Sequence, residues 1–100
     1  MRLFISALLV CSASGALAQG CNSTDMRENM KWCTINAQFA VKSAFCRELK
    51  QGQVDGAIGS MDDCQRGQGD HDKIMNNARA CGNQAVYNAL QEFSGNLGCP

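Results

Sequence analysis

DHDKIMNNARACGNQAVYNALQEFSG, residues 70–95, is the stretch that decides the fold class of this chain. Asp70 or Asp72 can cap a helix at its start, where a carboxylate also suits the positive end of the helix dipole. The apolar side chains recur every three to four residues and form one stripe, made by Ile74, Ala78, Cys81, Ala85 and Ala89. This spacing is typical of one face of a helix. We therefore expect one helix that runs to about Phe93, with Gly82 as a weak point near its middle.

A second long helix is predicted upstream, over residues 25–50, because this segment contains neither Gly nor Pro. Asp25 and Glu28 have the spacing of a capping box, and Gly52 is a natural stop. Two apolar lines run along nearly opposite sides of this helix: Met26, Met30, Cys33, Ala37, Ala40 and Ala44, and then Trp32, Ile35, Phe39 and Cys46. Such a helix is either packed between neighbours or broken near residues 34–36. We expect the unbroken helix, since no strong breaker is present.

The segment between these helices shows a weaker helical pattern, with apolar residues at Val54, Ile58, Met61 and Cys64. Gly56 and Gly59 interrupt it, and each costs about 1 kcal/mol relative to Ala inside a helix. We expect a short helix here. No window alternates between apolar and polar residues as a strand does. The sequence thus predicts an all-α fold, a small bundle of three or four helices cross-linked by three disulfides.

The first residues of the chain, 1–18, have the three parts of a secretory signal peptide. Arg2 supplies the positive charge, residues 3–11 supply the apolar run, and small residues lead to a cut after Ala18. The apolar run is shorter than the about 20 residues that a membrane span needs, so no membrane anchor is expected. The predicted organisation is a signal peptide followed by one disulfide-stabilised helical domain, residues 19–100, that is secreted and extracellular.

The cysteines predict how this domain is held together. One of the seven, Cys11, falls within the predicted signal peptide and leaves six: Cys21, Cys33, Cys46, Cys64, Cys81 and Cys99. An even number in a short exported chain indicates a disulfide framework. In an up-down-up bundle the expected pairs are Cys21–Cys99, Cys33–Cys64 and Cys46–Cys81, one of fifteen connectivities. The closely spaced pairs typical of zinc and redox sites are absent from the sequence, so no metal or cofactor is expected.

The charge balance excludes some classes of partner. The whole chain has nine basic and nine acidic residues, and loss of Arg2 with the signal peptide leaves one excess negative charge. Nucleic acids and anionic membranes select for clustered Lys and Arg. We therefore expect no nucleic-acid partner.

Catalytic chemistry has little support in the sequence. The pair His71-Asp72 is the one combination that looks catalytic, but it lacks the nearby cysteines and the calcium loop that accompany such a pair in secreted phospholipases A2. Asp62, Asp63 and Asp70 complete an acidic segment without the spacing of an EF-hand loop. No G-x-S-x-G motif is present. We expect no enzyme, no catalytic residue and no bound metal.

A few other residues are candidates for modification or contact. Asn22 begins the sequence Asn-Ser-Thr, a glycosylation acceptor in an exported chain, so a glycoprotein is expected in a eukaryotic host. Trp32 and Tyr87 are residue types that anchor interfaces, although Trp32, beside Cys33, is expected to pack over a disulfide. The methionines either fill gaps in a thin core or line a lipid cavity, and we expect the first; they are Met26, Met30, Met61 and Met75.

These features together predict a secreted, cysteine-rich, non-enzymatic binding protein of the toxin, defence or signalling type. Disulfide-dense domains of this size are rigid, and a rigid surface loses little entropy on binding. The expected partner is an extracellular protein such as a receptor or channel. The alternative is an extracellular carrier of a small apolar ligand or lipid, held in a cavity of the helical bundle.

Overall fold

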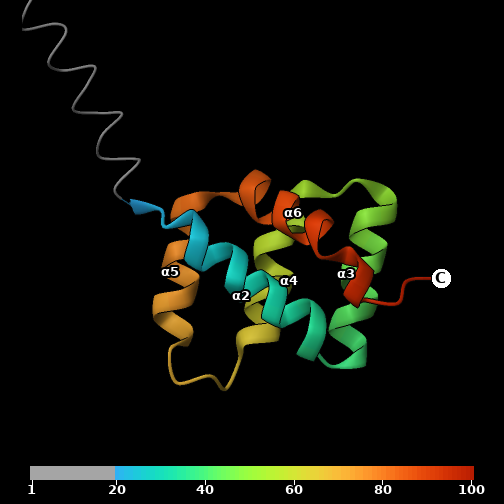
Figure 1. The fold of residues 1–100 in the computed structure, drawn as a ribbon, viewed down its shortest axis with the longest axis horizontal. Helices are drawn as coiled ribbons and strands as arrows, with labels where there is room; N and C mark the ends of the chain where they lie inside the picture. Colours follow the sequence, from blue (N-terminus) through green and yellow to red (C-terminus); the bar gives the residue numbers. More distant parts are fainter. Residues whose placement is uncertain (1–19) are drawn as a thin grey trace, which may run out of the picture.

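The computed structural model describes residues 20–100, and the predicted signal peptide lies outside this range. The described residues form an all-α domain with three disulfides, as the sequence predicts (Figure 1). In chain order its elements are α2 (Ser23–Asn36), α3 (Phe39–Gln51), the 3₁₀ helix η1 (Val54–Gly56), α4 (Ala57–Gln65), α5 (His71–Cys81), α6 (Asn83–Glu92) and the 3₁₀ helix η2 (Ser94–Asn96).

The core lies around α4, which packs against α2, α3, α5 and α6. The largest fully buried side chains of the core include Phe45, Leu90 and Val86. The four methionines of the sequence analysis, Met26, Met30, Met61 and Met75, are also buried in this cluster. They fill the space that a core poor in Leu and Ile leaves, as predicted.

The first long helix is broken, so the prediction of an unbroken helix is wrong. Ala37 and Gln38 have extended backbone, with ψ of 148° and 159°. The Asn36 side chain donates to the Trp32 carbonyl at 3.0 Å and so satisfies a carbonyl in the last turn of α2. Asn in this position competes with the backbone for hydrogen bonds and favours the end of a helix. Each of the two apolar lines of the sequence is therefore divided between α2 and α3.

The start of α2 also differs from the prediction. The cap is Asn22, whose side-chain oxygen accepts a hydrogen bond from the Asp25 backbone N–H at 3.0 Å. Asp25 lies in the first turn of the helix, where its negative charge suits the helix dipole. At the far end, Gly52 ends α3 in a left-handed conformation, as predicted.

The helix expected over residues 70–95 is divided at Gly82 into α5 and α6. Gly82 has φ 94° and ψ 158°, a region of backbone space that is almost restricted to glycine. The next residue, Asn83, accepts a hydrogen bond from the Ile58 backbone N–H at 3.1 Å and ties the start of α6 to α4. A glycine that a straight helix would merely tolerate is thus the corner between two helices.

The disulfides join Cys21 to Cys81, Cys33 to Cys64 and Cys46 to Cys99. The Cys33–Cys64 pair was predicted correctly, and the other two pairs were not. The prediction assumed straight helices, whereas the corner at Gly82 ends α5 beside the start of α2. Two hydrogen bonds between Asn22 and Asn77 connect the same two helices, at 2.7 and 2.9 Å.

Candidate interaction surface

Three large apolar side chains are exposed where α2 ends and α3 begins. The exposed fractions are 39% for Trp32, 49% for Ile35 and 85% for Phe39. We call these three residues the apolar corner. They are the exposed part of the second apolar line in the sequence.

The expectation that Trp32 packs over a disulfide is wrong. Cys33 is fully buried and turns toward α4, where the Gln65 side chain donates to its Sγ at 3.2 Å. Successive side chains on a helix are about 100° apart, so Trp32 points away from that contact. Tyr87, the other interface candidate, is only 6% exposed and belongs to the core, so its assignment as an interface residue is also wrong.

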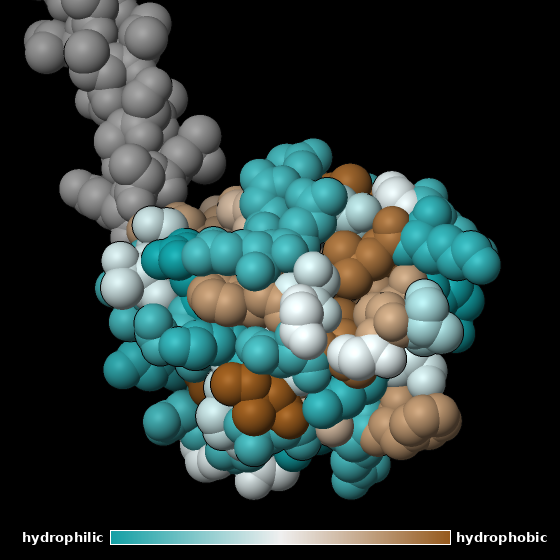
Figure 2. All heavy atoms as spheres, turned by 45° about the vertical axis from the view of Figure 1, so that its right-hand side comes forward, coloured by the Kyte–Doolittle hydropathy of each residue, from teal (hydrophilic) through white to brown (hydrophobic). Residues whose placement is uncertain are grey.

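A groove adjoins the apolar corner, between α3 and the C-terminal segment. It has two parts, with volumes of about 900 and 340 Å³, which share Cys46, Gly98 and Pro100. Phe39 lines the smaller part, together with Leu97. The Cys46–Cys99 disulfide lies in the groove and holds its two walls together. Figure 2 turns the side of the molecule with α3 forward and shows apolar side chains exposed between hydrophilic ones.

The charged side chains along the groove have one sign. Lys42, Arg47 and Lys50 line it, and none of its lining residues is Asp or Glu. The single acid of α3, Glu48, is buried on the other face of the helix, where it accepts a hydrogen bond from the Ser60 hydroxyl. Burial raises the pKa of this carboxyl above its usual value of 4.5. Pro100 also lines the groove and adds its α-carboxylate, so the three basic side chains leave a net positive charge. We call this groove the cationic groove.

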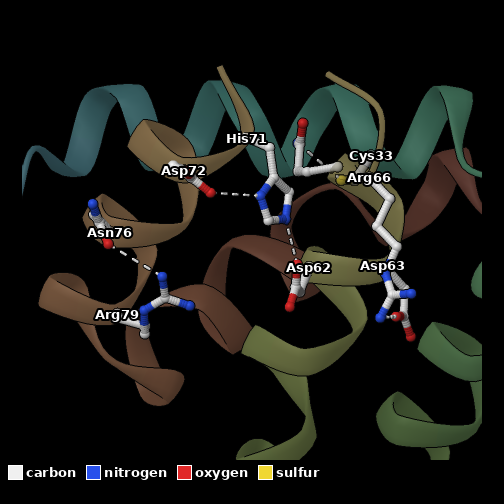
Figure 3. Close-up of polar contacts among 9 residues, drawn as sticks. Cys33, Asp62, Asp63, Arg66, His71, Asp72, Asn76 and Arg79 are labelled. Carbon is white, nitrogen blue, oxygen red and sulfur yellow. Dashed lines mark hydrogen bonds and ion pairs between the residues drawn. The ribbon is translucent and has the colours of Figure 1, made fainter. Parts of the chain in front are cut away.

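The acidic segment contains a histidine held between two carboxylates. His71 contacts Asp62 of α4 through Nε2 at 2.5 Å and its neighbour Asp72 through Nδ1 at 3.2 Å (Figure 3). The hydrogen bond to Asp62 and then that to Asp72 raise the pKa of His71 above 6.5. The contact with Asp62 connects α4 to α5. Within residues 20–100, no group of three or more His, Cys, Asp or Glu side chains is arranged to hold a metal ion.

Asn22 lies at the exposed start of α2. Its side-chain oxygen caps the helix, while its backbone N–H donates to the Asn77 side chain. A glycan would attach to the side-chain nitrogen of Asn22. Glycosylation of this residue stays a prediction.

Sequence reasoning missed the cationic groove. The three basic residues of α3 are visible in the sequence, but the balanced charge of the whole chain does not indicate that they line one groove. The second wall of the groove follows from the pairing of Cys46 with Cys99, which was not predicted.

No family model, curated protein or solved structure matches this chain. Among residues 20–100, no helix combines the length and the apolar character that crossing a bilayer demands.

Proposed function

We propose that this protein is a secreted, non-enzymatic binding protein that acts on an extracellular protein target, in the manner of a toxin, defence or signalling molecule. The observation that carries the proposal is the apolar corner. Trp32, Ile35 and Phe39 are exposed on a domain that has few large apolar residues for its own core. Aromatic residues are enriched at the centres of protein interfaces.

The scaffold supports this proposal. Three disulfides cross-link the described domain, and such bonds persist in oxidising compartments. The signal-peptide pattern of residues 1–18 agrees with export to such a compartment. Cross-linking also keeps the apolar corner in one arrangement before binding, which lowers the entropy lost in the complex.

The alternative function, transport of a small apolar ligand, has less support. The methionines that were candidates for a lipid cavity are packed in the core: Met26, Met30, Met61 and Met75. None of them lines the cationic groove. Evidence for a bound apolar ligand is therefore the test result that would favour a carrier.

The test is binding of the purified protein to intact cells. The protein is produced by secretion from a eukaryotic host, labelled with a fluorophore, and added to a panel of cells before and after treatment of their surfaces with trypsin. We expect saturable binding to at least one cell type and loss of this binding after trypsin. We also expect the variant Trp32→Ser/Ile35→Ser/Phe39→Ser to lose it while keeping the circular dichroism spectrum of the wild type.

A matched variant controls for the number of substitutions. Gln68, Gln84 and Gln91 are exposed and lie outside the apolar corner and the cationic groove. Their triple Ser variant should bind as the wild type does. Equal binding by the apolar-corner variant would contradict the proposal. A lipid that co-purifies in native mass spectrometry, or displacement of a fluorescent fatty acid, would instead favour the carrier.

A further inference from the structure

The charge of the cationic groove and its position beside the apolar corner together indicate the chemistry of the partner. We infer that the groove binds an acidic peptide segment of the target protein, one that carries an apolar side chain between its carboxylates. This inference rests on the proposed function and adds the chemistry of the target.

The electrostatic argument comes from the separation of charge within the domain. Lys42, Arg47 and Lys50 face the groove, and their one acidic neighbour on α3 is turned into the core. Their positive charges therefore lack a nearby carboxylate side chain among the residues that line the groove. A segment of opposite charge would be attracted to them and held in register by them.

The spacing of the cations favours a peptide over a fatty acid. Lys50 lies eight positions after Lys42, so the cations span about 12 Å along the helix axis. A fatty acid has one carboxylate and would use one end of this row. An extended peptide advances about 3.3 Å per residue and can place several carboxylates along it.

The apolar part of the groove provides a place for the peptide's apolar side chain. Phe39, Leu97 and Cys46 line the smaller part, and Leu49 and Cys99 line the larger part. Phe39 also belongs to the apolar corner. The corner and the groove therefore form one continuous surface in which apolar contact and positive charge lie side by side.

The inference is tested with a defined probe, the synthetic peptide Glu-Glu-Leu-Phe-Glu-Glu, titrated into the isotope-labelled protein and followed by two-dimensional amide NMR. We expect shifts in the amide signals of residues 42–51 and 94–99. The variant Lys42→Ala/Arg47→Ala/Lys50→Ala should weaken binding about tenfold, as the sum of three solvent-accessible charge contacts. The control Arg66→Ala/Lys73→Ala/Arg79→Ala removes three exposed cations outside the groove and should leave the affinity unchanged.

Several outcomes would overturn the inference. One is equal binding of the peptide with Lys in place of Glu, and another is no shift at the groove with the acidic peptide. A third is a shift at these amides with oleate but not with the acidic peptide, which would make the occupant a small apolar ligand. A fourth is a concentration-dependent dimer that the triple groove variant abolishes, which would make the occupant a second copy of this chain.

The cell assay distinguishes failure of this inference from failure of the proposed function. If the acidic peptide does not bind but the apolar-corner variant still loses trypsin-sensitive cell binding, only the inference that the partner is acidic is wrong. If cell binding is absent for the wild type as well, the proposed function is wrong.

Discussion

Replacement of Gly82 by Ala tests the corner between α5 and α6. The backbone at this position, φ 94° and ψ 158°, is one that L-residues avoid. Holding a residue with a Cβ there costs about 1–3 kcal/mol. Loss of glycine's freedom in the unfolded chain offsets about 0.4–1 kcal/mol of this cost. No atom beyond Gly82 and its two chain neighbours lies within 4 Å of the added Cβ, so packing against other residues contributes little. We therefore expect Gly82→Ala to lower the free energy of unfolding by about 1–2 kcal/mol.

Gly59→Ala is the matched control, because this glycine also has open space around its added Cβ. Gly59 lies within α4 and its φ is not positive. Ala is about 0.5–1 kcal/mol more favourable than Gly inside a helix. The same substitution should therefore stabilise the protein at Gly59 and destabilise it at Gly82.

The measurement is urea unfolding with the disulfides intact, followed by far-ultraviolet circular dichroism, with thermal unfolding in parallel. Each kcal/mol corresponds to about 4–8 °C in Tm for a domain of this size. A continuous helix through Gly82 would make Gly82→Ala stabilising, by about as much as Gly59→Ala. A rise in stability for Gly82→Ala would thus refute the corner and restore the single helix that the sequence pattern suggests.

Three further tests probe charge and cross-linking. Because the pKa of His71 is raised, its contacts stabilise the fold below pH 6.5, and this stabilisation is lost as pH rises through the folded-state pKa. We therefore expect Tm to fall over this pH range. His71→Asn or Asp62→Asn should remove that fall. Because burial raises the pKa of Glu48, the folded state holds this proton more tightly, and stability should fall as pH rises above 4.5; Glu48→Gln should flatten that slope. Cys33→Ala/Cys64→Ala opens a loop with a sequence separation of 31 and should cost about 3–4 kcal/mol in urea unfolding, with a loss under 1 kcal/mol counting against the structural role of this bridge.

The periodicity of apolar residues was enough to predict the helical class and the approximate positions of the helices. Burial of Met30 and Met61 follows from their places in that pattern. The two breaks could not be predicted in the same way. Gly82 is compatible with either a tolerated helix position or a corner, and the hydrogen bond from Ile58 to Asn83, which joins segments 25 residues apart, helps to fix the corner.

The candidate site was partly visible in the sequence. Trp32 was recognised as an interface residue type, but its place beside a half-cystine favoured the core. The exposure of Trp32 depends on how α2 is rotated about its axis. The disulfide from Cys33 to Cys64 on α4 helps to set this rotation. Tyr87 shows the reverse error, since a residue off the main stripe of α6 is buried by contacts that α6 makes with other helices.

The order of the bridges along the chain has a consequence for damage by proteases. The Cys21–Cys81 and Cys46–Cys99 loops overlap, so every peptide bond between Cys21 and Cys99 lies inside at least one of them. Hydrolysis at any one point in this interval, including the exposed turn of residues 66–70, leaves the two fragments covalently joined. A molecule nicked once in this interval would keep its mass, apart from one added water, until its disulfides are reduced.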